Sequence, residues 1–272
     1  MADINTCSAK KRKRIGRAKC QQTKAVYRVL DPEVVEPGAS GFCALAVMTK
    51  APRAGQVKTR LVPPLTPDEA AELNVCFLRD TTAAISQACG KHARGIAVYT
   101  PVGAEADYID ILPRGFQLVP QRGEGFGERL ALAVEDLFQI GFASVCLIDS
   151  DSPTIPAKSY ADAARLLSMQ GDRVVLGPSD DGGYYLIGLN KMQRRLFEKI
   201  DWSTERVLAQ TTQRAAEFDI EVKLLPTGYD VDDCTTLRRL CHELLGHDAA
   251  STVATAPNTR EFLRKLVTQK EL

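Results

Sequence analysis

Short apolar runs alternate with longer amphipathic stretches along most of the chain. The run FCALAVM at 42–48 is apolar throughout and bounded by turn residues, a pattern typical of a strand buried on both faces of a parallel sheet. After it, Thr66, Pro67 and Glu69 provide an N-cap, a proline at the first helical position and a capping-box glutamate, which predicts a helix reaching about residue 89. The same alternation predicts strands at 95–99, 117–120, 144–148, 173–176, 184–189 and 221–225, and helices at 104–112, 127–140, 157–169, 191–198, 204–218, 235–245 and 259–269.

Strands that alternate with helices in this way predict an α/β fold, a three-layer α/β/α domain with a mostly parallel sheet. We expect this domain to span residues 41–246. Residues 1–40 are expected to form a basic, flexible N-terminal extension, and residues 247–272 a linker followed by a C-terminal helix that docks on the domain.

Composition places the chain among ordinary globular proteins. The 272 residues are 44% hydrophobic and 25% charged, which excludes disordered, collagen-like and membrane-embedded classes. The net charge of +1 hides an asymmetry, because residues 1–24 hold eight basic side chains and one acidic, leaving 27 basic against 33 acidic. The basic extension is expected to be a solvated tail; the alternative is a weak polyanion-binding arm, but nucleic acid is not an expected partner.

Location and redox state follow from two further features. No apolar stretch approaches the roughly 18 to 20 residues needed to cross a bilayer, so no membrane association is expected. The eight cysteines have no secretion signal and no zinc-knuckle spacing, which indicates reduced thiols in a cytoplasmic protein. Three histidines supply little for a histidine metal centre.

The loop that follows the first predicted strand is strongly basic. Four cations surround a glycine in KAPRAGQVKTRL, a composition suited to binding phosphate oxygens through charge and backbone amides. The loop is not a Walker A motif, because the glycines that this motif requires are absent, and the alternative is a solvated basic turn. The expected nucleotide- and phosphate-binding residues here are Lys50, Arg53, Gly55, Lys58, Thr59 and Arg60.

Acidic residues follow two other predicted strands. DSDSP begins at residue 149 and GYDVDD at residue 228, and the carboxyl ends of parallel strands meet at one edge of a sheet. Carboxylates gathered there would suit Mg²⁺ or Mn²⁺ bound to a polyphosphate, with the metal stabilising the leaving group. The alternative is helix capping, by Asp151 or Ser152 in the first loop and by Asp233 in the second. The candidate metal ligands are Asp149, Asp151, Asp230 and Asp232.

Two glycine-rich segments are further candidates for binding. RGEGFGERL at 122–130 opens a helix, and its Gly125 could admit a nucleotide close to the backbone, although the spacing is not that of a dinucleotide fingerprint. GPSDDGGYY at 177–185 precedes a predicted strand and is equally consistent with acceptor recognition or with a tight structural turn. The candidate substrate-binding residues in it are Asp180, Asp181, Gly182 and Gly183.

The ordered motifs KAPRAGQVKTRL, RGEGFGERL, IDSDSP, LGPSDDGGYYLIGL, DWST and DVDD resemble a family of glycosyltransferase-A-like proteins within the nucleotide-diphospho-sugar transferase superfamily. Members include selenodomain-associated and arsenosugar-biosynthesis transferases, and the superfamily also contains molybdenum cofactor and 2-phospho-lactate guanylyltransferases. The resemblance covers about residues 42–246 and implies that Asp151 is the principal metal ligand, Asp232 the C-terminal one, and Lys58 and Arg60 part of the phosphate-binding loop. Pro52 and Arg53 replace part of the usual glycine-rich loop, so base specificity is not carried over.

These observations predict an Mg²⁺-dependent glycosyltransferase that moves a sugar from a nucleoside diphosphate sugar to a small-molecule acceptor. Lys58, Arg60 and Asp151 are the expected catalytic residues, the cations supporting the departing nucleotide and Asp151 positioning the metal. One alternative is a nucleotidyltransferase that couples a nucleoside triphosphate to a phosphorylated small molecule and releases pyrophosphate. Another is a nucleotide-binding protein without catalytic activity.

Overall fold

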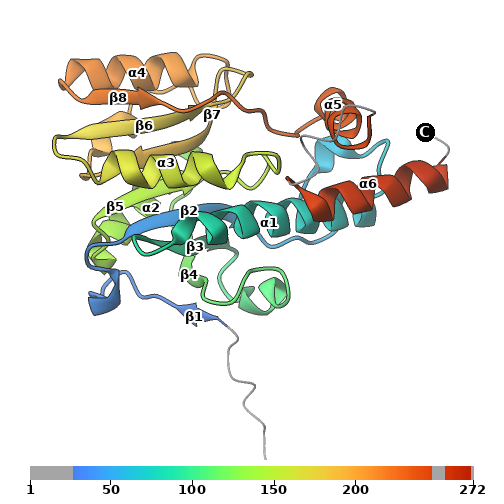
Figure 1. The fold of residues 1–272 in the computed structure, drawn as a ribbon, viewed down its shortest axis with the longest axis horizontal. Helices are drawn as coiled ribbons and strands as arrows, with labels where there is room; N and C mark the ends of the chain where they lie inside the picture. The colour runs from blue at the N-terminus through green and yellow to red at the C-terminus, as the bar shows by residue number, and fades with distance from the viewer. Residues whose placement is uncertain (1–26, 247–254, 271–272) are drawn as a thin grey trace, which may run out of the picture.

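One eight-stranded sheet organises the chain in the computed structural model, which describes residues 27–246 and 255–270 (Figure 1). The strand order is β1-β4-β3-β2-β5-β7-β6-β8. Only β7 runs antiparallel to its neighbours, so the sheet is mostly parallel, as predicted. The strands are β1 (Arg28–Val29), β2 (Cys43–Lys50), β3 (Ala93–Thr100), β4 (Gln117–Pro120), β5 (Ser144–Ile148), β6 (Arg173–Pro178), β7 (Tyr184–Leu189) and β8 (Glu221–Leu224).

Helices cover both faces of this sheet. Side chains of α1 and α3 pack with one face, and side chains of α2 and α4 pack with the other, so the three-layer α/β/α prediction is confirmed. The continuous apolar run at 42–48 forms the buried strand β2, which lies between β3 and β5. The helices are α1 (Pro67–Cys89), α2 (Phe126–Ile140), α3 (Ala157–Leu167), α4 (Val207–Glu217), α5 (Cys234–Leu245) and α6 (Pro257–Lys270). None of the helices in the described ranges is long and apolar enough to cross a bilayer.

The start of α1 follows its sequence signal. The Thr66 hydroxyl accepts a hydrogen bond from Glu69 N at 3.2 Å, and the Glu69 carboxylate accepts one from Thr66 N at 2.7 Å. These two bonds form the predicted capping box, which satisfies backbone N–H groups that the first helical turn leaves unpaired. The helix therefore begins at the predicted residue.

Two predicted helices are shorter than expected. The 104–112 segment forms only a 3₁₀ turn, Glu105–Tyr108, because the chain reverses at Asp110, whose φ of 63° lies in the left-handed region. The 191–198 segment likewise forms the 3₁₀ turn Arg194–Phe197, and the left-handed Lys199 lies two residues after it. A residue with positive φ cannot continue a right-handed helix, so neither segment forms a longer helix.

The folded part of the chain begins earlier than residue 41. Strand β1 pairs with β4, the Tyr27 hydroxyl donates to the Leu112 carbonyl at 2.6 Å, and Leu30 and Ala39 are buried. Residues 27–40, expected in the flexible extension, therefore pack against the domain. Two exposed strand residues carry almost no hydrophobic pattern, which is why the sequence did not indicate β1. The basic cluster at 10–24 lies outside the described residues.

The C-terminal helix α6 lies alongside α1 (Figure 1). Leu263 and Leu266 of α6 are buried in a cluster with Phe77 of α1. The buried Asp80 of α1 accepts hydrogen bonds from the backbone N–H groups at the start of α6, at 3.0 Å from Asn258 and 2.8 Å from Thr259. A carboxylate at a helix N-terminus is favourable because it pairs unsatisfied donors and the positive end of the helix dipole.

An Asp80→Ala variant is expected to lose about 2 to 3 kcal/mol of unfolding free energy, since buried donors lose a charged acceptor. Urea denaturation followed by circular dichroism measures this loss. Glu72→Ala, on an exposed position of the same helix, is the matched control and should change stability little. Equal stability of the two variants would show that Asp80 does not hold α6.

Candidate functional site

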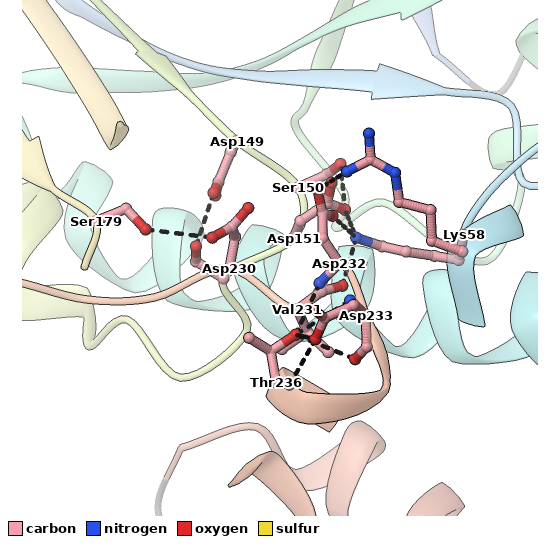
Figure 2. Close-up of polar contacts among 12 residues, drawn as sticks. Lys58, Asp149, Ser150, Asp151, Ser179, Asp230, Val231, Asp232, Asp233 and Thr236 are labelled. Carbon is pink, nitrogen blue, oxygen red and sulfur yellow. Dashed lines mark hydrogen bonds and ion pairs between the residues drawn. The ribbon is translucent and has the colours of Figure 1, made fainter. Parts of the chain in front are cut away.

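The predicted basic and acidic loops meet at one edge of the sheet (Figure 2). The loop 51–61 follows β2, Asp149 follows β5, and the loop 225–233 follows β8. All three strands point the same way across the sheet, so their carboxyl ends deliver these loops to a common place. The sheet topology therefore places side chains that are about 170 positions apart in direct contact.

Lys58 lies at the centre of these contacts, and Figure 2 shows it reaching between Asp151 and Asp232. Its Nζ is 3.0 Å from Asp151 Oδ1 and 3.0 Å from Asp232 Oδ1, and it donates to the Val231 carbonyl at 2.8 Å. The lysine side chain is only 5% exposed, while those of Asp151 and Asp232 are 32% and 47% exposed. Lys58 thus supplies a buried cation that faces two solvent-accessible carboxylates.

Electrostatics keep this lysine charged. Burial alone lowers the pKa of Lys58, but the carboxylates of Asp151 and Asp232 raise it by more, so its pKa lies above the ordinary value. The backbone of Lys58 has a φ of 48°, in the left-handed region that non-glycine residues seldom adopt. The residue with this unfavourable backbone conformation is thus the one whose ammonium group points into the site.

Two further aspartates lie deeper in the site. Asp149 Oδ2 accepts a hydrogen bond from Ser152 Oγ at 2.7 Å, and Asp230 Oδ1 accepts one from Ser179 Oγ at 3.2 Å. Burial raises the pKa of both carboxyl groups, with Asp151 adding to the effect on Asp149 and Asp181 to the effect on Asp230. The site therefore holds more carboxylates than its neighbouring cations neutralise.

Two cavities adjoin these residues. One has a volume of about 250 Å³ and is lined by basic-loop residues, and the other has a volume of about 590 Å³ and is lined by aspartates and by apolar side chains. The two cavities have four lining residues in common: Arg60, Ser150, Asp151 and Asp232. A ligand that extended across this shared wall would meet cations on one side and carboxylates on the other.

Most of the predicted site residues line these cavities. The members of the basic loop at the smaller cavity are Lys50, Lys58, Thr59 and Arg60. Those at the larger cavity are the four predicted metal ligands Asp149, Asp151, Asp230 and Asp232, together with Asp181 and Gly183 of the second glycine-rich segment.

The other predicted residues are engaged elsewhere. Arg53 pairs with Asp107, its Nε lying 2.7 Å from the carboxylate, and Asp180 pairs with Arg239 of α5. Gly55 and Gly182 adopt positive φ values of 72° and 89° in turns. Gly125 is the N-cap residue of α2. None of these five lines either cavity among the described residues.

The helix-capping alternative holds in the second acidic loop and fails in the first. Asp233 caps α5, because its carboxylate accepts hydrogen bonds from Thr235 N and Thr236 N at 2.8 Å. The N-cap of α3 is Pro156, so neither Asp151 nor Ser152 caps that helix. Asp151 is therefore free of a structural role in α3.

The lining residues of the larger cavity that the sequence analysis did not name as site residues include Phe126, Trp202 and Glu205. Trp202 and Glu205 belong to the loop between β7 and α4, where a helix was expected from residue 204, and Phe126 is the first residue of α2. The structure shows why residue 127 is a glycine, since a Cβ there would lie 2.1 Å from Trp202 Nε1. Only a glycine leaves space for the tryptophan at this point.

A Gly127→Ala variant should therefore displace Trp202. Alanine would ordinarily stabilise a helix by about 0.5 to 1 kcal/mol over glycine, but here we expect lower stability and a shifted emission maximum from Trp202, the single tryptophan of the protein. Gly38→Ala is the control, because its Cβ would meet nothing closer than 3.7 Å. A stabilised Gly127→Ala variant with unchanged emission would contradict this packing.

The donor chemistry of the site fits a hard cation. Carboxylate oxygens are the ligands that Mg²⁺ and Mn²⁺ prefer, and Asp149 Oδ1 is buried without a hydrogen-bond partner among the described residues. Nevertheless, no three histidine, cysteine, aspartate or glutamate side chains within residues 27–246 and 255–270 are grouped to hold a metal ion. Lys58 holds the two expected principal ligands, Asp151 and Asp232, so a metal would share them with this lysine.

Comparison with known proteins bears on the fold and the enzyme class. Residues 82–204 match the family model described as an uncharacterized protein conserved in bacteria (DUF2064). No protein among those of curated function matches the sequence. A candidate nucleotide-diphospho-sugar transferase from Desulfovibrio desulfuricans is 29% identical, with a TM-score of 0.70 over 83% of this chain and 98% of that chain.

A nucleotidyl transferase from Methanothermobacter thermautotrophicus matches at 13% identity, with a TM-score of 0.50 over 74% of this chain and 96% of its own. That likeness is one of fold. Together with the Desulfovibrio structure, it confirms that the chain has the fold of nucleotide-diphospho-sugar transferases and nucleotidyltransferases, which are transferase enzymes.

Proposed function

We propose that the protein is a divalent-metal-dependent transferase that uses a nucleotide-activated donor, and that it moves a sugar from a nucleoside diphosphate sugar to a small-molecule acceptor. The observation that carries this proposal is the wall shared by the two cavities, where Arg60 lies with Asp151 and Asp232, and Lys58 contacts both carboxylates from the smaller cavity. The likeness to the Desulfovibrio protein supports the donor class. We include in this proposal that the protein is related to the selenodomain-associated and arsenosugar-biosynthesis transferases, which its sequence motifs resemble.

Each group of residues has a defined role in this proposal. Lys50 and Arg60 bind the phosphate oxygens of the donor from the smaller cavity, and the buried positive charge of Lys58 beside them helps to stabilise the charge of the departing nucleoside diphosphate. Asp151 and Asp232 would hold Mg²⁺ or Mn²⁺, which when bound neutralises diphosphate charge and so favours departure of the leaving group. Lys58, already between these carboxylates, aligns them and lines the cavity that receives the phosphates.

Nucleotidyl transfer is the second candidate reaction. Three cations at the smaller cavity suit a nucleoside triphosphate as well as a diphosphate. The fourth cation of the loop, Arg53, pairs with Asp107 and lines neither cavity, so the charge available for the larger polyphosphate is less than the sequence suggests.

Incubation of the full chain with Mg²⁺, an acceptor panel and each nucleotide tests the proposal. Nucleoside diphosphate released from a nucleotide sugar would support glycosyl transfer, and pyrophosphate released from a nucleoside triphosphate would support nucleotidyl transfer. ³¹P NMR distinguishes the two products. Nucleotide binding that produces neither product with any acceptor would favour a non-catalytic protein.

A further inference from the structure

One side of the larger cavity is aromatic. Phe126 is 51% exposed and Trp202 is half-buried, and their ring centroids lie 5.4 Å apart in an edge-to-face arrangement with an interplanar angle of 70°. Both side chains line the cavity. Ligand pockets are lined mainly by apolar and aromatic side chains, so this aromatic pair is what a ligand site would present.

The position of Trp202 is fixed before any ligand binds. Trp202 N donates to the Ile200 carbonyl at 3.0 Å, and the neighbouring Asp201 exchanges two hydrogen bonds with Gln210 of α4, at 2.7 and 2.8 Å. On its other side the indole lies against Gly127 of α2. The Trp202 side of the aromatic wall therefore requires little ordering when a ligand contacts it.

Apart from Arg60, the charged side chains that line this cavity are acidic. Asp181, Glu205 and Asp230 line it with the other site aspartates, and Arg60 is the single cation among its described lining residues. An ionised carboxylate only accepts hydrogen bonds, so the complementary ligand must donate them. The buried, unpaired Asp149 Oδ1 at the same cavity needs such a donor or a cation. A ligand group with its own negative charge would be repelled.

We propose that the Phe126–Trp202 wall and the carboxylates of Asp181 and Glu205, which line the same cavity, form a specificity subsite for the sugar ring of the donor, and that this subsite selects uncharged, hydroxylated rings. The apolar face of such a ring packs on the aromatic wall, and its hydroxyl groups donate to the carboxylates. Rings that carry a carboxylate or phosphate are excluded by charge. This inference rests on the proposed function and adds to it the class of sugar.

Trp202 provides a direct test, because it is the protein's single tryptophan. With Mg²⁺ present, the full chain is titrated with nucleoside diphosphates, nucleoside diphosphate glucoses and the matching glucuronates, which differ from the glucoses by one carboxylate. Emission from Trp202 reports contact with the ring, and thermal shift reports nucleotide binding independently. We expect a glucose conjugate to change the emission beyond the effect of its nucleoside diphosphate and to bind about 10-fold more tightly than the glucuronate.

Variants separate the two parts of the subsite. Phe126→Ala should weaken binding of the glucose conjugate about 10-fold and leave that of the nucleoside diphosphate unchanged, with the exposed Met169→Ala as control. Glu205→Gln should narrow the preference for glucose over glucuronate, with the exposed Glu198→Gln as control. Equal affinity for the two conjugates, or unchanged Trp202 emission despite a nucleotide thermal shift, would overturn the subsite and leave the proposed function standing. Absence of any nucleotide thermal shift would overturn both.

Discussion

An Asp151→Asn variant is expected to lose at least about 100-fold in Mg²⁺-dependent turnover, with the nucleotide sugar or triphosphate that the wild type uses. Asparagine keeps the shape of the side chain but removes the charge that would hold the metal at the shared wall of the two cavities. Metal stabilisation of a departing phosphate contributes several kcal/mol, and about 2.7 kcal/mol corresponds to a factor of 100. Asp232→Asn should have an effect of similar size, since Lys58 contacts both carboxylates equally closely.

Initial-rate measurements over a range of Mg²⁺ concentrations check this expectation. The matched control is Asp162→Asn, an aspartate on α3 whose ion pairs with Lys158 and Arg165 lie at the surface. The control should retain wild-type turnover. If both Asp151→Asn and Asp232→Asn kept wild-type rates and wild-type Mg²⁺ dependence, neither aspartate would have the proposed role in binding the metal.

A Lys58→Met variant should lower both the stability of the protein and its affinity for nucleotide. Methionine matches the length of the lysine chain but leaves Asp151 and Asp232 facing each other without the shared ammonium group. Removing one partner of a fully buried ion pair costs about 3 to 5 kcal/mol, and because these carboxylates are partly exposed we expect about 2 kcal/mol. Nucleotide affinity should fall about 10- to 100-fold, because the phosphates lose the attraction of a buried positive charge beside their cavity.

The effect of Mg²⁺ on the melting temperature shows whether Lys58 shares its carboxylates with a metal or has only a structural role. Without Lys58 the two carboxylates are available to a cation alone, so Mg²⁺ should raise the melting temperature of Lys58→Met more than that of the wild type. Differential scanning calorimetry with and without Mg²⁺ measures the difference. Lys223→Met, which breaks a surface ion pair with Glu221, is the control. Identical Mg²⁺ responses in Lys58→Met and wild type would mean that Asp151 and Asp232 do not bind the metal.

The strands and the basic and acidic loops could be predicted because their signals are local. A continuous apolar run predicts a buried strand such as β2, and the strand ends then place Lys58, Asp151 and Asp232 at one edge of the sheet. The same pattern could not show that Lys58 bridges the two carboxylates. That contact depends on a left-handed backbone at Lys58 and on the crossing of chain segments far apart in sequence.

Features that depend on tertiary packing lay beyond the sequence pattern. Arg53 and Asp180 have the charge expected of site residues, but Asp107 and Arg239 hold them outside the cavities. Conversely, Trp202 lies in a loop just before the helix predicted at 204–218. Its contact with Gly127 joins two segments that β5, β6 and β7 separate along the chain. Charge and propensity indicate which residues are available, and the packing decides which of them face the ligand.

Calorimetric titration of nucleoside diphosphates into the full chain, with Mg²⁺ and then with EDTA, tests the central claim most directly. The account predicts micromolar to millimolar binding of at least one nucleotide in Mg²⁺, weakened about 10-fold or more in EDTA and weakened in Mg²⁺ by up to the same factor in the Asp151→Asn and Asp232→Asn variants. Failure of every nucleoside diphosphate to bind in Mg²⁺, or binding that neither EDTA nor these substitutions weaken, would contradict it.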